Sequence, residues 1–322
     1  MRAIRVRETG GPEVLRVETV DDPIAGPGEI VMRLEAVGVN FIDIYNRRGI
    51  YRSPLPFTPG EEGAGTVAAV GPGVADLHVG DRVVSNNLRG SYAELAVVAA
   101  DRVVAIPDDV STHTAAAVLL QGITAHYLST SVYPLQPGDT CLVHAAAGGV
   151  GLLLCQVAKR RNAIVIGTVS SEEKAALARE AGADEVIIYT KQDFVAEVGR
   201  ITGGKRAQVV YDSVGATTFE KSLQCLAPRG MMALFGQSSG VVPPFDPLLL
   251  LRNGSLFLTR PTIAHYVASR DELVWRAGEV LGWVRDGSLD VRIDRTVPLA
   301  DAAEAHRALE ARRTTGKVLL VP

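Results

Sequence analysis

The segment GDTCLVHAAAGGVGLLLCQVAK, residues 138–159, restricts the possible folds of this chain most strongly. A turn leads into a short apolar run, a bend of small residues follows, and an amphipathic helical pattern begins directly after the bend. Ala145, Gly148 and Gly151 have the spacing A-x-x-G-x-x-G, a variant of the pattern that brings backbone N–H groups close to a pyrophosphate at a helix start. The alternative is simple close packing of a strand against a helix. The segment therefore predicts a βαβ unit that binds a dinucleotide.

Apolar runs and helical segments alternate from this turn to residue 259. The runs are continuous rather than alternating in polarity, which is typical of parallel strands buried on both faces. Helical segments such as residues 171–183 join them, so we predict an α/β fold with a doubly wound, Rossmann-type sheet of six parallel strands. The predicted strands are residues 140–145, 163–169, 185–189, 208–214, 231–236 and 255–259.

The first hundred residues follow a different pattern. Short β-branched runs are separated by Gly, Pro and Asp, which is typical of an all-β region, and a helical pattern over residues 111–128 marks the change of domain. After Thr259 two helical segments and a last strand, residues 316–322, are too short for a third core. We therefore predict a β-rich domain over residues 1–123, a nucleotide-binding domain over 124–260, and a return to the first domain over 261–322.

The end of the second predicted strand indicates which dinucleotide binds. An NAD site usually carries Asp or Glu there, which accepts a hydrogen bond from the ribose 2′-hydroxyl. Here the strand is followed by Ser170 and Ser171, which are neutral donors, and Lys174 comes one helical turn later. These groups suit a 2′-phosphate, so NADPH is predicted. A serine N-cap with a solvated lysine is the alternative, and both can hold together.

Composition excludes several other classes of protein. The formal net charge is −3 and no Lys/Arg run is present, so neither nucleic-acid binding nor attachment to an acidic membrane is expected. Cys141, Cys155 and Cys225 lie far apart without a C-x-x-C pair, which argues against a disulfide framework and a zinc knuckle. The chain starts without a signal-peptide pattern, and no apolar stretch reaches ~18 residues. We expect a cytoplasmic protein without membrane insertion that acts on a small molecule.

Residues 138–159 also resemble the signature of the quinone oxidoreductase and zeta-crystallin family of medium-chain dehydrogenases/reductases. The resemblance extends over the whole chain and includes GGPEVL (10–15), GVNFIDIYNRRGIY (38–51), GDRV (80–83), VVYDSVG (209–215) and LFGQSSG (234–240). It implies a GroES-like β domain that the Rossmann domain interrupts and the C-terminal segment completes, with the active site in the cleft between them. It also implies a homodimer and the NADPH-dependent reduction of a quinone.

The resemblance further implies that no zinc is bound. Zinc-dependent members of the superfamily have Cys where this chain has Asn40, and Gly-His-Glu where it has GEE, residues 60–62. Since both aligned ligands are missing, Glu61 is expected to be structural and Glu62 to brace the cleft. Zinc needs three or four N, S or O ligands, and the six histidines offer no alternative set. His144 is expected to make a polar contact with its neighbours, and the other five to have surface or helix-face roles.

Candidate catalytic residues lie in NFIDIYNRRGIY, residues 40–51. Hydride transfer to a quinone requires a protein that holds the nicotinamide against the acceptor and stabilises negative charge on its carbonyl oxygen. Suitable groups are the amide of Asn40 as a donor, the carboxyl of Asp43, and the phenols of Tyr45 and Tyr51. The alternative is a turn role for the first two and packing for the tyrosines. By the resemblance, the nicotinamide is lined by Phe41, Ile42, Asp43, Ile44 and Tyr45, and the substrate by Asn40 and Tyr51.

The remaining cofactor contacts are implied by the resemblance at positions that match the family motifs. Most of them follow predicted strands, where ligands bind in parallel sheets; Arg312 could equally be a solvated helix end. They are Tyr127, Gly148, Gly149 and Val150 at the pyrophosphate, Ser170, Ser171, Lys174 and Tyr189 at the adenosine phosphate, and Val214, Gly236, Gln237, Ser238, Ser239, Pro261, Thr262 and Arg312 elsewhere.

Two other functions stay open at this point. Reduction of the activated C=C bond of a 2-alkenal or enone uses the same hydride delivery, and the motifs do not separate it from quinone reduction. A crystallin-like protein that binds NADPH or RNA is a minor alternative. The net charge of −3 and the lack of a basic or aromatic patch argue against RNA.

Overall fold

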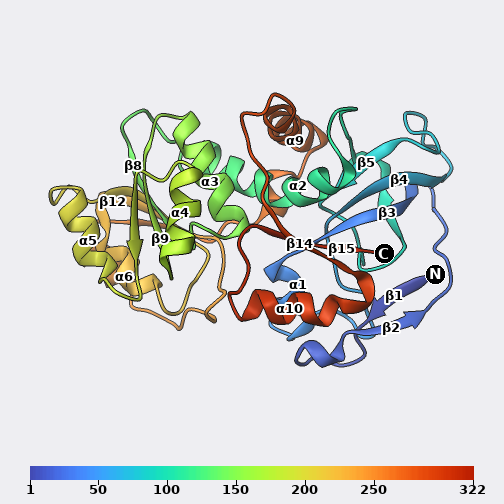
Figure 1. Cartoon of the computed structure of the whole chain (residues 1–322), viewed down its shortest axis with the longest axis horizontal. Coiled ribbons are helices and arrows are strands. Elements are labelled where there is room, and N and C mark those ends of the chain that lie inside the picture. The colour runs from blue at the N-terminus through green and yellow to red at the C-terminus, as the bar shows by residue number, and fades with distance from the viewer. The chain divides into compact units, whose positions relative to one another are not determined.

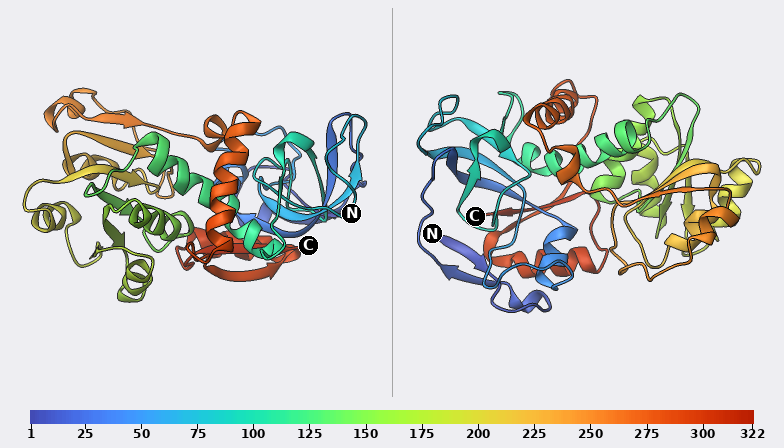
Figure 2. Two further views of the ribbon diagram at one scale, coloured as in Figure 1. Left: turned by 90° about the horizontal axis from the view of Figure 1, so that it is seen from above. Right: turned by 180° about the vertical axis from the view of Figure 1, so that it is seen from behind.

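A computed structural model describes all residues of the chain, 1–322, in two compact units (Figures 1 and 2). The first unit consists of residues 1–120 and 269–322, and the second of residues 121–268. The domain limits drawn from the sequence, 1–123, 124–260 and 261–322, stay a prediction. No helix combines the length and the apolar character that a membrane crossing requires.

The second unit is built on a sheet of six parallel strands in the order β10-β9-β8-β11-β12-β13. Each predicted strand has a counterpart, and the predicted fold class is confirmed. The fifth strand begins earlier than the predicted residue 231, because Leu226 pairs with Ala207 ahead of an irregularity in the register. The strands are β8 (Thr140–His144), β9 (Ile164–Val169), β10 (Glu185–Ile188), β11 (Ala207–Asp212), β12 (Leu226–Leu234) and β13 (Phe257–Thr259).

Helices cover both faces of this sheet. The helix α3 (Gly149–Arg160) and the helix α4 (Glu172–Glu180) contact each other and pack on β8, β9 and β10. On the opposite face lie α5 (Phe194–Ile201) and α6 (Phe219–Gln224), as Figure 1 shows. The unit also contains the end of α2 (Thr112–Tyr127) from residue 121 onward, a π-helical turn (Leu128–Val132), α7 (Leu248–Arg252) and α8 (Ile263–Tyr266).

The first unit is rich in β-structure and contains a seven-stranded sheet. Its strand order is β14-β15-β3-β4-β5-β7, and β6 pairs with β3 outside this path. A separate two-stranded sheet joins β1 (Arg2–Arg5) and β2 (Arg16–Thr19). The strands of the larger sheet are β3 (Glu29–Val39), β4 (Gly63–Val70), β5 (Arg82–Ser85), β6 (Leu95–Ala99), β7 (Val104–Ala105), β14 (Ile293–Pro298) and β15 (Lys317–Val321).

The end of the chain returns to this sheet. Strand β15 is antiparallel to β3, with Val318 opposite Val39, and it also pairs with β14; Figure 1 labels the three strands. This register brings Lys317 to the point where β3 ends and α1 (Phe41–Arg47) begins. The helices α9 (Arg270–Arg285) and α10 (Ala302–Glu310) complete the unit, and side chains from β3, β15 and α10 share one apolar core.

Candidate active site

The helix α1 places the predicted catalytic residues directly after the longest strand of the first unit. The chain leaves β3 at Val39, and Asn40 is the extended residue that precedes the helix. The backbone N–H of Asn40 donates to Asp43 Oδ2 at 2.8 Å, which satisfies one of the donors that a helix start leaves without a partner. The turn role considered for Asn40 and Asp43 is therefore present in the structure.

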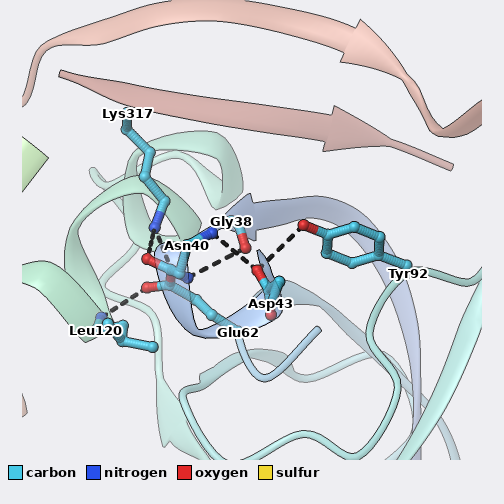
Figure 3. A network of polar contacts seen from close by, with 7 residues as sticks. All are labelled: Gly38, Asn40, Asp43, Glu62, Tyr92, Leu120 and Lys317. Atoms are coloured by element: carbon cyan, nitrogen blue, oxygen red, sulfur yellow. Dashed lines mark hydrogen bonds and ion pairs between the residues drawn. The ribbon is translucent and has the colours of Figure 1, made fainter. Parts of the chain in front are cut away.

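A buried network surrounds the side chain of Asn40 (Figure 3). Its amide Nδ2 donates to the carbonyl oxygen of Gly38 at 3.2 Å and to Glu62 Oε2 at 3.0 Å. Its Oδ1 accepts from Lys317 Nζ at 2.8 Å. Both amide hydrogens thus have acceptors inside the protein; the role of Asn40 as a donor to a quinone stays a prediction.

Glu62 connects four parts of the first unit. Its Oε2 is 2.5 Å from Lys317 Nζ, and its Oε1 accepts the backbone N–H of Leu120 at 2.6 Å. Both charged side chains are almost fully buried, at 0% exposure for Glu62 and 1% for Lys317. The carboxylate therefore links β15, the start of α1 and helix α2, in which Leu120 lies, to the segment before β4.

A second chain of hydrogen bonds starts at Asp43. Tyr92 Oη lies 3.1 Å from Asp43 Oδ2 and 3.0 Å from His306 Nε2, and His306 Nδ1 lies 3.0 Å from Arg47 Nη1. Because arginine can only donate, Nδ1 of His306 accepts and its Nε2 carries the hydrogen. The phenol of Tyr92 then accepts from His306 and donates to Asp43. Arg47 also binds Glu310 at 2.7 Å.

Burial shifts the pKa values of Asp43 and His306, two members of this hydrogen-bonded network, in opposite directions. It raises the pKa of Asp43 to about 7, although the N–H of Asn40 favours the ionised form. It lowers the pKa of His306 to about 3, with a further contribution from the positive charge of Arg47. The second oxygen of Asp43, Oδ1, is buried without a hydrogen-bond partner. Near neutral pH the site thus combines a carboxyl that can change protonation with an imidazole that stays neutral.

The aromatic candidates form a small cluster at the same helix. The rings of Phe41 and Tyr45 are 6.1 Å apart, and Tyr51 meets Tyr45 edge-on at 5.5 Å. Tyr51 is exposed, whereas Tyr45 and Ile44 are buried. The structure therefore brings Asn40, Asp43, Tyr45 and Tyr51 together around α1, and Phe41 and Ile42 are half-buried beside them.

The cofactor-contact candidates of the second unit gather at one edge of its sheet. Since all six strands are parallel, their carboxyl ends face the same edge, where ligands bind in this fold. Ser170 and Ser171 follow β9, Tyr189 follows β10, and Val214 follows β11. Gly236, Gln237, Ser238 and Ser239 follow β12, and Pro261 and Thr262 follow β13.

Tyr127, at the end of α2, stacks on Tyr266 with ring centroids 4.3 Å apart. Arg312 lies in the first unit, just after α10, and is exposed.

The bend between β8 and α3 has the shape of a pyrophosphate cradle. A Cβ on Gly151 would lie 2.3 Å from the carbonyl oxygen of Ala145, and one on Gly149 would lie 2.2 Å from the amide of Gln121. Ala145 takes the left-handed conformation, φ 53°, at the position where the fingerprint has its first glycine. Gly148 caps α3 without a side chain, so the first N–H groups of the helix are open to an anion. These features fit a dinucleotide.

The end of β9 carries no acidic side chain. Ser171 is the N-cap of α4, and its Oγ accepts from the backbone N–H of Lys174 at 3.3 Å. The capping alternative is therefore present in the structure. This cap is compatible with a 2′-phosphate, because it uses only the backbone N–H of Lys174. The lysine that carries the ammonium group lies one helical turn after Ser170. Glu172, which follows the two serines, is exposed and pairs with Lys191.

His144 makes the polar contacts expected of it. Its Nδ1 is 2.9 Å from Thr168 Oγ1 and its Nε2 is 2.9 Å from Ser222 Oγ. Burial lowers the pKa of the imidazole. The ring thus joins β8, β9 and α6 as a neutral, structural group.

The oxygens at Asn40 and Glu62 do not fit a metal ion. No group of three or more His, Cys, Asp or Glu side chains is placed to hold one. The ammonium of Lys317 instead lies between the amide oxygen of Asn40 and the carboxylate of Glu62, where it makes the contacts that a cation would make. Glu61 is partly buried, and burial raises the pKa of its carboxyl. The oxygens of Asn40 and Glu62 therefore bind the ammonium group of Lys317 in place of a metal ion.

Several residues of the site are not identified by the sequence alone. Neither Lys317 nor Tyr92 is selected by a motif, and His306 is fully buried, although the sequence predicts an ordinary surface or helix-face role for it. Their partners are distant in sequence: Lys317 is 277 positions from Asn40, and His306 is 214 from Tyr92. The only signal for Lys317 is its position at the start of a strand whose other residues are apolar.

Known protein families match both units of the chain. The zinc-binding dehydrogenase family matches residues 149–275, and the alcohol dehydrogenase GroES-like domain matches residues 26–108. A quinone oxidoreductase of Pseudomonas aeruginosa is 46% identical over 323 residues, which are 100% of this chain and 99% of that protein. The 2-haloacrylate reductase of a Burkholderia species is 40% identical and is covered to 98%, as is this chain.

A solved structure agrees over the full length. The quinone oxidoreductase of Escherichia coli, crystallised with NADPH, has a TM-score of 0.98, 42% identity and complete coverage of both chains. The β-rich unit, the six-stranded parallel unit and the glycine cradle define a medium-chain dehydrogenase/reductase. Within that superfamily the chain belongs to the quinone oxidoreductase family.

Proposed function

We propose that this protein is an NADPH-dependent quinone reductase that works without zinc. The observation that carries the proposal is the agreement of the entire chain, cradle included, with a quinone oxidoreductase whose structure was solved with NADPH. The ammonium of Lys317 between Asn40 and Glu62 supports zinc independence, because it already donates to the oxygens that a metal would need.

The residues of the chain divide the work between binding and positioning. NADPH, when bound, supplies the reducing equivalents. We assign its pyrophosphate to Gly148, Gly149 and Val150 with Tyr127 nearby, and its 2′-phosphate to Ser170, Ser171, Lys174 and Tyr189. Val214, Gly236, Gln237, Ser238, Ser239, Pro261, Thr262 and Arg312 complete the assigned contacts. In the first unit, residues 41–45 are assigned to the nicotinamide, and Tyr51, Asp43 and Asn40 to the acceptor side.

We also propose that the protein is a cytoplasmic homodimer. The strand β13 is one of the two edge strands of the parallel sheet, and Phe257 on it is 58% exposed. In the helix just before it, Leu248 and Leu251 are exposed as well. An apolar strand edge suits pairing with a second copy. The three cysteines are free and buried, which suits a reducing compartment.

A panel assay tests the activity. Purified protein treated with a chelator is expected to oxidise NADPH faster with a simple ortho- or para-quinone than with 2-alkenals. Metal analysis of the active protein should find no stoichiometric zinc. Tight NADPH binding without turnover of any acceptor would instead support the crystallin-like binding protein.

Reduction of an activated C=C bond is the second candidate. The observation in its favour is the Burkholderia 2-haloacrylate reductase, which matches almost the full chain at 40% identity. The same assay decides between the two, because a preference for 2-alkenals or 2-haloacrylates over every quinone would favour this candidate.

A further inference from the structure

Lys317 is the most unusual buried side chain outside the assigned contacts. It begins β15, its exposure is 1%, and its ammonium donates to Asn40 Oδ1 and Glu62 Oε2 at 2.8 and 2.5 Å. Removing a lysine and a carboxylate from water is costly, and a well-packed apolar pair is often as stable. Stability alone therefore does not explain why an ion pair stands here.

The surrounding backbone is shaped to admit this pair. A Cβ on Gly38 would lie 2.2 Å from Glu62 Oε2 and 2.8 Å from Lys317 Nζ. A side chain at position 38 would therefore require the ends of the Glu62 and Lys317 side chains to shift. The carbonyl oxygen of the same glycine accepts from Asn40 Nδ2.

The network fixes Asn40 in one orientation. Its Oδ1 faces a group that can only donate, and its Nδ2 faces the Gly38 carbonyl and the Glu62 carboxylate, which can only accept. A flipped amide would place Nδ2 against the ammonium and Oδ1 against two acceptors. The orientation is therefore determined by Lys317 on one side and Glu62 on the other.

We propose that Lys317 is a positioning residue, a built-in cation that holds Asn40 and thereby the start of α1 in the geometry that the acceptor requires. The inference rests on the proposed quinone reduction. Residues 40–45 are the segment assigned to the nicotinamide and the acceptor, and the Lys317–Asn40 contact fixes its first residue. Lys317 acts through Asn40, and Asn40 fixes the position of residues 40–45.

Three variants test this role. Lys317→Met removes the ammonium but leaves the Glu62 carboxylate buried without its cation, which is expected to destabilise the protein. Lys317→Met combined with Glu62→Gln removes both charges, so this double variant is expected to fold. In this double variant the new amide at position 62 can donate, which allows Asn40 to flip. Lys221→Met is the matched control, because Lys221 forms an exposed pair with Asp193 at 2.6 Å in the second unit.

The expected result separates positioning from folding. The double variant should have a thermal midpoint close to that of the wild type and an NADPH dissociation constant within about twofold. Its kcat with a quinone should nevertheless fall by about 10²-fold, the loss typical of a reacting group misplaced by about 1 Å. The control should keep wild-type turnover. A double variant with normal stability and wild-type kcat would overturn the proposal.

A second readout does not depend on activity. In protein labelled with ¹⁵N-asparagine, the side-chain N–H₂ signal of Asn40, assigned with Asn40→Ser, should exchange slowly with solvent in the wild type. In the double variant it should exchange at least about tenfold faster, because one fixed orientation is lost. Unchanged exchange would overturn the role of Lys317. If the wild type turns over no quinone while this difference is present, the proposed function fails and the positioning role stands.

Discussion

At the scale of single residues, Asp43 and His306 affect stability in opposite directions. The pKa of Asp43 is raised to about 7, so between about pH 4 and 7 the folded protein holds a proton that the unfolded chain has released. The contribution of Asp43 to the free energy of unfolding therefore falls as pH rises. The pKa of His306 is lowered to about 3, so between about pH 3 and 6.5 the unfolded chain holds the extra proton and stability rises with pH. The two contributions offset each other over about pH 4–6.5 in the wild type.

Single substitutions should expose each contribution. Asp43→Asn keeps an oxygen that accepts from Asn40 and Tyr92, and it should make the protein less stable at pH 4.5 than at pH 6.5. His306→Gln should have the reverse slope, with lower stability at pH 6.5 than at pH 4.5. Each slope is at most about 1.4 kcal/mol per pH unit. Unfolding in urea at several pH values measures this slope, and His78→Gln, at an exposed histidine, is the control. If the free energy of unfolding depended on pH in the same way for both buried variants, the pKa shifts of Asp43 and His306 would be contradicted.

Lys174 tests the choice of cofactor at the same scale. It lies on α4, one turn after the two serines at the end of β9, where no acidic residue is present. Lys174→Ala is expected to raise the KM for NADPH by about tenfold, or about 1.4 kcal/mol, with little change for NADH. Lys205→Ala, on an exposed loop of the same unit, is the control. An equal effect on both cofactors would remove Lys174 from the phosphate site.

At the scale of elements, the β8–α3 bend depends on close approach of backbone atoms. A methyl group on Gly151 would meet Ala145 O at 2.3 Å and Ala146 Cα at 2.8 Å, and neither backbone atom can move alone. Gly151→Ala should therefore destabilise the protein by about 1–3 kcal/mol, as overpacking does. Gly199→Ala on α5 is the matched control, since nothing lies within 4 Å of its Cβ. It should stabilise by about 0.5–1 kcal/mol through helix propensity. Equal unfolding free energies would show that the bend is not tightly packed.

The elements that the sequence predicts well are those whose signals are local. The parallel strands and α3 follow from apolar runs and from the spacing of Ala145, Gly148 and Gly151. The network at Asn40 could not be predicted in this way, because it depends on the register of β15 against β3, which places Lys317 beside a residue 277 positions away. Likewise, nothing near His306 in the sequence indicates that Tyr92 and Arg47 will contact it. Charged and polar partners of this kind are set by the sheet topology.

At the scale of the whole molecule, the C-terminal segment returns to the first unit, and for this reason residues from both the N-terminal and the C-terminal part of the chain form the site. Residues 269–322 belong to the same unit as residues 1–120, and they contribute β14, β15, α9 and α10. Lys317 and His306, which hold Asn40 and the Tyr92–Asp43 pair, both come from this return. Loss of the last strand would therefore remove part of the site together with part of the core.

A charge at the exposed edge of β13 should separate two copies of the chain. If the edge of the sheet at β13 pairs with its equivalent, a charge on Phe257, which is 58% exposed, must be buried on pairing and should prevent it. Light scattering after gel filtration should give twice the 34.2 kDa of one chain for the wild type and a single chain for Phe257→Asp. Val79→Asp, at an exposed loop of the first unit, is the control and should stay dimeric. A wild type of 34.2 kDa at micromolar concentration would refute the dimer, and a dimeric Phe257→Asp variant would move the interface to another surface.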